Sequence, residues 1–233
     1  MKGKIYLIPV PLGENSNHTI PVYVIEILHK LDYFIAEKAK TARRFIKTTN
    51  PDRPISVLNM VEINKFTDES ELPSFIQPAL DGHDIGVISE AGCPGVADPG
   101  AAIVQLAHKN NLEVIPLVGP SSILLALMAS GMNGQNFAFN GYLSPKKNEL
   151  GQELKKLEAH SKRMKQTQIF METPYRNNAI LETALKSLSN GTNFGFAVDI
   201  TLPSQEIKVK KISEWKKIGF PDLHKRLAIF LLY

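Results

Sequence analysis

Three short apolar stretches of the chain end directly in turns that are rich in glycine and proline. The stretches are Ile5–Ile8, Ile85–Ile88 and Val114–Val118, and the turns that follow them lie at 9–13, 92–100 and 119–122. Glycine and proline shape turns that expose bare backbone N–H and C=O groups. One such turn could be an ordinary connection between a strand and a helix. Three of them favour a ligand cleft, because ligands of open α/β sheets bind beyond the carboxyl ends of the strands.

Strand-like and helix-like patterns alternate along the chain, which predicts an α/β protein of two domains. Residues 1–118 are expected to form a mainly parallel sheet with helices on both faces. Residues 119–233 are expected to form a mixed sheet flanked by helices. The strands are predicted at 5–8, 33–36, 54–58, 85–88, 112–118, 137–142, 167–171, 193–200, 205–212 and 228–232. The helices are predicted after an N-cap at Thr19 and at 38–47, 69–80, 99–110, 120–132, 146–162 and 178–188.

The composition is that of a mildly basic globular protein. The 233 residues include 27 Lys and Arg against 23 Asp and Glu, a formal charge of +4, and these charges are spread along the sequence. Such a surface tolerates nucleic acid without demanding it. The single cysteine, Cys93, excludes an intrachain disulfide and fits a reducing cytoplasm. No apolar run approaches the ~20 residues that span a bilayer, so no membrane segment is expected.

Several kinds of chemistry lack their sequence signatures. The chain has no glycine-rich loop for a nucleoside triphosphate or dinucleotide and no nucleophile elbow around a serine. Its six histidines lie far apart, so no metal site is expected. Methyl transfer from S-adenosylmethionine suits this inventory, because that reaction needs mainly the positioning of the two reactants.

Four segments resemble those of the tetrapyrrole methylase superfamily, the class III S-adenosylmethionine-dependent methyltransferases. Within it, the chain is most similar to the enzymes that 2′-O-methylate a cytidine of small-subunit ribosomal RNA. The segments are Pro9–Gly13 with Thr19, Ser89–Gly100, Pro116–Ser122 with Ala129–Gly131, and Phe170–Arg176.

The resemblance implies a cofactor, S-adenosylmethionine, in a cleft between the two α/β domains of a homodimer subunit. It also implies that the substrate is RNA. The residues that it places at the cofactor are Pro11, Gly92, Cys93, Pro94, Ala97, Ser121, Ser122, Met171, Glu172 and Thr201.

The segment that begins at Ala36 departs from the RNA-methylating enzymes. They usually carry Ala-Glu-Asp-Thr-Arg, whereas this chain reads Ala-Glu-Lys-Ala-Lys and keeps only Glu37 of the polar residues. Lysine does not replace the bidentate contacts of arginine. Three alternatives therefore stay open: methylation of a small molecule such as a tetrapyrrole, a non-catalytic protein that binds the cofactor, and an RNA-binding module without a cofactor.

Glu37 and Arg176 are the candidate catalytic residues. Glu37 follows a predicted strand and could act as a base, as could Asp98, although Asp98 is expected to cap the following helix. Arg176 could hold the acceptor or pair with a carboxylate. The basic run 38–47 could be a solvated helix face or could contact RNA phosphates.

Overall fold

The computed structural model describes residues 1–146 and 148–233 in full, and Lys147 only by its place in a helix. The chain divides into two compact units, Met1–Ser121 and Ser122–Tyr233. This division falls after residue 121, where the sequence analysis placed it after residue 118. No helix among the described residues is both long and apolar enough to cross a membrane.

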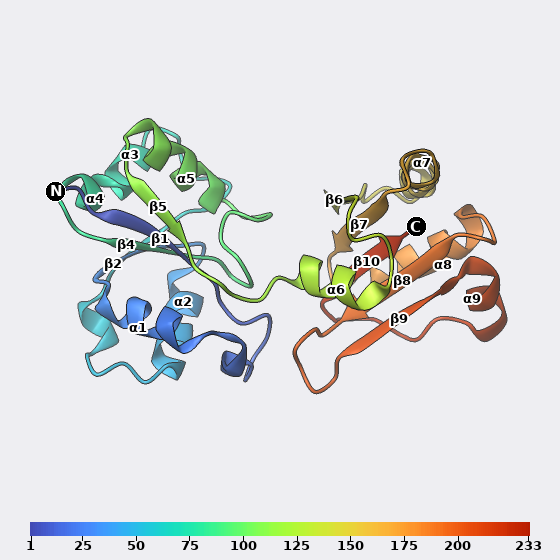
Figure 1. Ribbon diagram of the computed structural model, residues 1–233, viewed down its shortest axis with the longest axis horizontal. Helices are drawn as coiled ribbons and strands as arrows, with labels where there is room; N and C mark the ends of the chain where they lie inside the picture. Colours follow the sequence, from blue (N-terminus) through green and yellow to red (C-terminus); the bar gives the residue numbers. More distant parts are fainter. The chain divides into compact units, whose positions relative to one another are not determined.

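The first unit contains a five-stranded parallel sheet in the order β3-β2-β4-β1-β5. Its helices cover both faces, as Figure 1 shows. The strands are β1 (Lys4–Ile8), β2 (Tyr33–Ala36), β3 (Asn59–Glu62), β4 (Ile85–Ile88) and β5 (Glu113–Pro116). The helices are α1 (Val22–Lys30), α2 (Ala39–Thr48), α3 (Leu72–Phe75), α4 (Gln77–Leu80) and α5 (Gly100–Lys109), with short 3-10 turns at Asn17–Thr19 and Ile55–Val57.

Successive residues of the strands face opposite sides, which gives this unit two cores. Ile8, Phe34 and Ile88 pack with α1 and α2 on one face of the sheet. Ile5, Ile35 and Val87 pack with α3, α4 and α5 on the other face. Because β4 is buried along its whole length, its sequence is a continuous apolar run.

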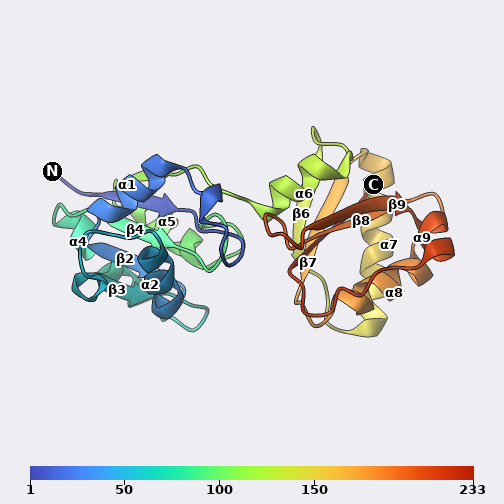
Figure 2. The ribbon, with the colours of Figure 1, turned by 90° about the horizontal axis from the view of Figure 1, so that it is seen from below.

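The second unit contains a mixed sheet in the order β6-β7-β10-β8-β9, with α6 on one face and the remaining helices on the other (Figure 2). Phe170, Phe194, Phe196 and Phe230 point to the side of α7, α8 and α9 and form its core with Trp215. The strands are β6 (Phe137–Tyr142), β7 (Thr167–Glu172), β8 (Asn193–Val198), β9 (Glu206–Lys211) and β10 (Ala228–Leu232). The helices are α6 (Ser122–Ser130), α7 (Lys147–Met164), α8 (Asn177–Ser187) and α9 (Ile212–Ile218).

The predicted fold class is confirmed, and so is the antiparallel pair β8–β9. Three local predictions are wrong. The segment 54–58 forms a 3-10 turn before β3, because Pro54 sets its backbone outside the sheet. The segment 69–80 forms two short helices that meet at Ile76. Thr19 does not cap α1: its hydroxyl donates to the Ser16 carbonyl, and Pro21 is the N-cap.

Candidate functional site

The three turns predicted to bind a ligand meet at one edge of the first sheet. Strands β4, β1 and β5 are neighbours and parallel, so their carboxyl ends lie at the same edge. Beyond the strand ends, Val10 and Gly92 exchange two backbone hydrogen bonds of 2.9 and 3.1 Å. The turn after β1 is thereby joined to the turn after β4.

The turn after β5 closes against the other two. The thiol of Cys93 lies 3.4 Å from the carbonyl oxygen of Pro120. A β-carbon added to Gly119 would come within 2.2 Å of Pro9, and one added to Gly92 within 3.3 Å of both Leu12 and the Pro120 carbonyl. Gly92 also has φ +72°, which favours glycine. The backbones of the three turns therefore lie close together, and a side chain at Gly119 or Gly92 would force them apart.

The candidate cofactor residues of this unit all belong to these turns. Gly92 and Pro94 are buried, and Pro11, Cys93 and Ser121 are partly exposed. Ala97 is exposed and has φ +60°, so its loop is held in a left-handed bend. Burial, and secondarily Asp98, raise the pKa of the Cys93 thiol. Cys93 is accordingly a protonated turn residue rather than an activated nucleophile.

An acidic corner lies at the ends of β2 and β4. Glu37, Ser89 and Asp98 line a shallow hollow there. Burial, followed by the nearby charges of Glu90 and Asp98, raises the pKa of Glu37. Burial also raises the pKa of Asp98. Glu90, which the sequence analysis did not single out, forms an ion pair with Lys38 at 2.9 Å.

Asp98 caps the first N–H group of α5 with its side chain, as predicted, although Pro99 occupies the N-cap position. Its Oδ1 accepts the N–H groups of Gly95 at 2.8 Å and Gly100 at 2.7 Å. Its Oδ2 is buried and has no hydrogen-bond partner among the described residues. Asp98 therefore holds the bend of the 92–100 turn through one oxygen and keeps the other unused.

Three of the four candidate residues of the second unit, Met171, Glu172 and Thr201, lie at one edge of its sheet. Strand β10 runs antiparallel to both β7 and β8, so β7 and β8 are parallel to each other and end on the same side. Ala228 lies in register with both Glu172 and Val198. Met171 and Glu172 thus end β7 close to the loop 199–205 that follows β8. Ser122 is the first residue of α6.

The loop after β8 is strained at Thr201. This β-branched residue has φ +72°, which its side chain disfavours. Its N–H donates to the side chain of Gln205 at 2.9 Å, while its hydroxyl oxygen is buried without a hydrogen-bond partner among the described residues. A strained residue with an unused buried hydroxyl is typical of a binding site.

Arg176 pairs with a carboxylate, which was one of its two predicted roles. Its guanidinium lies 3.0 Å from Glu172 Oε2 and also donates to the Ser144 carbonyl at 2.9 Å. Glu172 is only 5% exposed, and its other oxygen accepts the N–H of Thr173 at 2.7 Å. A buried carboxylate needs such a partner.

Arg226 is a residue of this edge that the sequence analysis missed. Its guanidinium donates to Asp199 at 2.8 Å, to Glu206 at 3.2 Å and to the Ser204 carbonyl at 2.6 Å. These contacts fasten both ends of the loop that carries Thr201. Its partners are distant in sequence, and no motif includes it.

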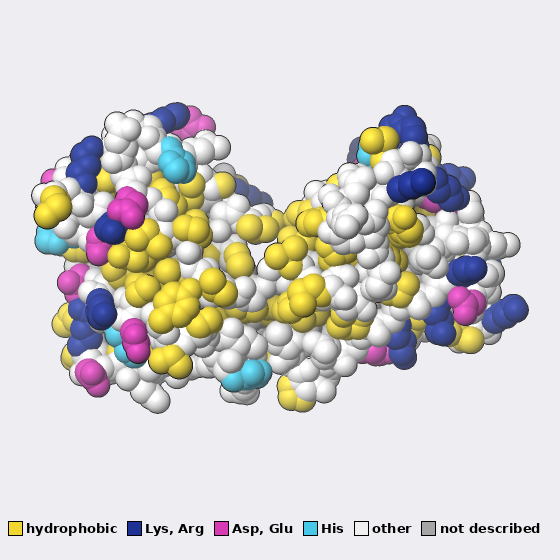
Figure 3. Space-filling view, viewed as in Figure 1, with side chains coloured by type: hydrophobic (Ala, Val, Ile, Leu, Met, Phe, Trp, Pro, Cys, Tyr) yellow, Lys and Arg dark blue, Asp and Glu magenta, His cyan; other side chains and the backbone are white. Residues whose placement is uncertain are grey.

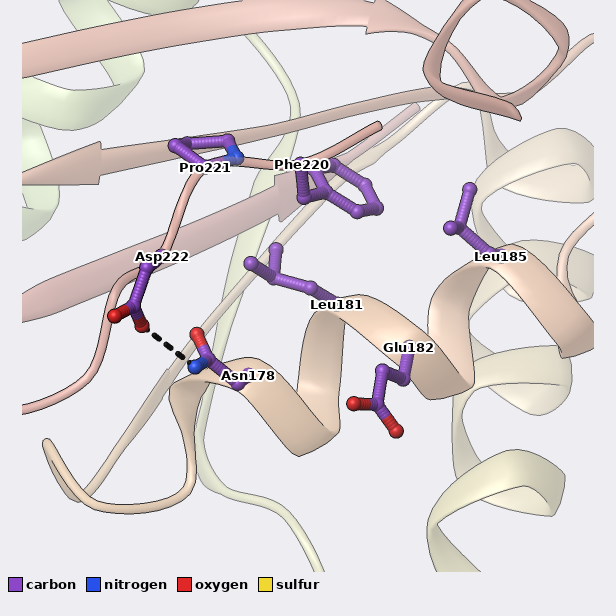
Figure 4. A pocket seen from close by; sticks show the side chains of 7 residues that line it. All are labelled: Asn178, Leu181, Glu182, Leu185, Phe220, Pro221 and Asp222. Carbon is purple, nitrogen blue, oxygen red and sulfur yellow. Dashed lines mark hydrogen bonds between the residues drawn. The ribbon is translucent and has the colours of Figure 1, made fainter. Parts of the chain in front are cut away.

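The apolar cleft of the second unit lies elsewhere. It has a volume of about 330 Å³ and is formed by α8 and the segment after α9. Figure 4 shows Leu181, Leu185 and Phe220 facing it, and the Asn178 amide donating to Asp222 at 2.7 Å on its rim. No candidate residue lines this cleft. Among the described residues, no group of His, Cys, Asp and Glu could hold a metal ion.

Comparison with known proteins identifies the class to which this fold and these turns belong. The profile of the tetrapyrrole (corrin/porphyrin) methylases matches residues 4–216. The chain belongs to this family, and the predicted family is confirmed. The predicted class of enzyme, a methyltransferase, agrees with it.

Similar sequences carry the name ribosomal RNA small subunit methyltransferase I. The protein of that name from Halalkalibacterium halodurans is 31% identical over 189 residues, which are 81% of this chain and 62% of that protein. The protein from Bacillus subtilis (strain 168) is 30% identical over 212 residues, which are 91% of this chain and 68% of that protein. The chain thus spans about two thirds of the length of these relatives.

Solved structures with the same fold are methyltransferases. The methyltransferase CobJ superposes with a TM-score of 0.64 at 18% identity, covering 98% of this chain and 93% of its own. The cobalt precorrin-4 methyltransferase CbiF superposes with a TM-score of 0.61 at 13% identity, covering 98% and 94%. At these identities the likeness establishes the fold alone.

Proposed function

We propose that this chain transfers a methyl group from S-adenosylmethionine to RNA, at a ribose 2′-hydroxyl of small-subunit ribosomal RNA. The observation that carries the proposal is the convergence of three glycine- and proline-rich turns at one sheet edge in a member of the methylase family. The names of the similar sequences favour ribosomal RNA as the acceptor. We further propose that the protein acts in the cytoplasm.

The cofactor would be held by residues of both units. In the first unit they are Pro11, Gly92, Cys93, Pro94, Ala97 and Ser121. In the second unit they are Ser122, Met171, Glu172 and Thr201. The residues fit such a ligand, because glycines let the backbones of the turns approach closely and because, among the described residues, the buried Thr201 hydroxyl has no hydrogen-bond partner. When bound, S-adenosylmethionine supplies an activated methyl group on a sulfonium.

Glu37 would accept the proton of the acceptor. A hydroxyl that becomes an ether loses its proton, and a nearby carboxylate with a raised pKa is a stronger base than an ordinary one. Glu37 has such a raised pKa. Arg176 is paired with buried Glu172. It would orient the Glu172 carboxylate rather than contact the reacting atoms.

We also propose a homodimer. The second unit exposes large apolar side chains, including Met128 at 77% and Tyr142 at 60%. Figure 3 shows hydrophobic side chains gathered over α6. Exposed apolar surface of this kind marks protein interfaces. Met128→Glu should convert the dimer to a monomer in sedimentation velocity; a wild-type monomer at high protein concentration would contradict the proposal.

Two experiments test the proposed activity. Calorimetry should detect binding of S-adenosylmethionine or its demethylated product, and Asp222→Asn, at the unrelated cleft, should bind equally well. Incubation with labelled cofactor should then place the methyl group on small-subunit ribosomal RNA. Label on a tetrapyrrole but not on RNA would favour the small-molecule alternative. Binding without any transfer would favour a non-catalytic protein, and folded protein that binds no cofactor would refute the proposal.

A further inference from the structure

The two units differ in the sign of their charge. Residues 1–121 contain 11 Lys and Arg against 14 Asp and Glu, a formal charge of −3. Residues 122–233 contain 16 Lys and Arg against 9 Asp and Glu, a formal charge of +7. The basic excess is therefore concentrated in the second unit, although the sequence analysis took it as spread. A charge difference of this kind within one chain indicates a polyanionic partner.

Part of this excess is gathered around one turn of the second unit. Lys162, from the last turns of α7, donates to the Ser189 hydroxyl at 3.2 Å. Lys216, from α9, donates to the Asn190 side chain at 2.7 Å. The Ser213 N–H also donates to the Asn190 carbonyl at 3.0 Å, which fixes the start of α9 beside the same turn. Two helices, α7 and α9, thus bring cations to the turn 189–190.

We call this surface the lysine corner, and define it by five exposed lysines: Lys162, Lys186, Lys211, Lys216 and Lys217. Figure 3 shows dark blue Lys and Arg side chains over both α7 and α9. Three carboxylates, Glu158, Glu182 and Glu214, lie within four residues of one of these lysines on the same helix or at its N-cap. Glu158 is only 8% exposed; it accepts hydrogen bonds from Ser189 and Thr192 and also forms an ion pair with Lys162 at 3.5 Å. Glu214 accepts the Lys211 N–H.

Favourable placement at helix ends does not account for all of these lysines. Lysines near a helix C-terminus complement a partial charge of about −0.5 per helix. The ends of α7 and α8 at this corner therefore contribute about −1, and Glu158 and Glu214 contribute −2. Glu182, which lies one helical turn before Lys186 in α8, contributes a further −1, so the five lysines leave a surplus of about +1.

The basic run of α2, in the first unit, is a weaker candidate. Lys38, at its N-cap, forms an ion pair with Glu90 at 2.9 Å, and Arg44 forms one with Glu14 at 3.3 Å. It also belongs to the unit with a formal charge of −3. A polyanion approaching that unit is repelled overall, whereas the second unit attracts it.

We infer that the lysine corner binds the sugar-phosphate backbone of RNA. The inference rests on the proposed function, and it adds where the RNA is held. The lysines act as point charges on flexible stems, so they contact phosphates without reading the sequence of the bases. Binding at this surface is accordingly expected to be strongly dependent on salt.

The test measures the binding of fluorescent single-stranded polyuridylate at several salt concentrations. A variant with Lys162, Lys186 and Lys216 each changed to Gln should bind about 100-fold more weakly at about 0.1 M salt. Its slope of log affinity against log salt should be shallower by about 2, since each phosphate contact contributes about 0.7. Lys30, Lys65 and Lys109 of the first unit, all exposed, supply the matched triple Gln control, which should bind like the wild type.

A second variant guards against misfolding. Lys186→Gln with Lys217→Gln leaves the hydrogen bonds of Lys162 and Lys216 intact, and should lower the slope by about 1.4.

Equal losses in the corner and control variants would overturn the inference, as would loss of binding to phosphatidylserine vesicles without loss of RNA binding. Binding of RNA through the corner by a protein that transfers no methyl group would contradict the proposed function and support the inference. If the corner variants methylated RNA as fast as the wild type, that result would support the proposed function and contradict the inference.

Discussion

Gly119 lies against Pro9 so closely that a β-carbon on Gly119 would come within 2.2 Å of the proline ring. We expect Gly119→Ala to separate the turns after β1 and β5 and to lower the free energy of unfolding by about 1–3 kcal/mol. Cofactor affinity in calorimetry should fall in the same variant. Gly134→Ala is the control, because nothing lies within 4 Å of a β-carbon there. Equal behaviour of the two variants would show that the close approach is unimportant.

The raised pKa of Glu37 predicts how its replacement changes stability with pH. A carboxyl group whose pKa is higher in the folded state stabilises the fold at low pH and loses that contribution as the pH rises through its folded-state pKa. Glu37→Gln should therefore unfold at higher denaturant concentration than the wild type near neutral pH. The difference should vanish below the ordinary pKa of glutamate, about 4.3. Urea denaturation across this range is the measurement.

The same replacement should abolish the proposed base. The wild-type rate of methyl transfer should rise with pH through the raised pKa of Glu37, because only the ionised carboxylate accepts a proton. Glu37→Gln should lower kcat by about 100-fold or more and leave cofactor affinity unchanged. An unchanged kcat with the same pH profile would assign Glu37 a structural role only.

The Glu172–Arg176 pair predicts a strongly non-additive double mutant. Arg176→Ala leaves a buried carboxylate without its cation and should cost about 3–5 kcal/mol of unfolding free energy. Adding Glu172→Gln removes the charge and should recover much of that loss. A double-mutant cycle from urea denaturation measures the coupling; additive losses would mean that the pair is not coupled.

The strained backbone of Thr201 predicts that a glycine there would raise the stability of the protein and lower its affinity for the cofactor. Glycine accepts φ +72°, so Thr201→Gly should release about 1–3 kcal/mol of backbone strain. The greater conformational entropy of glycine in the unfolded chain should cost about 0.5–1 kcal/mol of this gain. Thr201→Gly should therefore raise the melting temperature by a few degrees. If the buried hydroxyl contacts the cofactor, its affinity should fall in the same variant. Higher stability with unchanged affinity would remove Thr201 from the binding site.

The sequence was sufficient to predict the features that depend on local pattern. Buried β4 appears as a continuous apolar run, and each glycine-rich turn follows a strand, so the parallel order brings the turns to one edge. The residues of the segment 54–58 favour a strand, but the segment begins with Pro54 and forms a 3-10 turn instead. Arg226 escaped prediction because its partners, Asp199 and Glu206, are 27 and 20 residues away. The charge difference between the units emerged only once their bounds were known.

The central position of β10 has a consequence for how the second unit is made. This strand is synthesised after the other strands of its sheet, yet it lies between β7 and β8. The backbone hydrogen bonds that join β6–β7 to β8–β9 all involve β10. Until residues 228–232 emerge, β6–β7 and β8–β9 remain two separate ribbons with unpaired inner edges. The first unit, by contrast, can complete its sheet during synthesis, so a nascent chain would carry a finished half and a half that is exposed to aggregation and to chaperones.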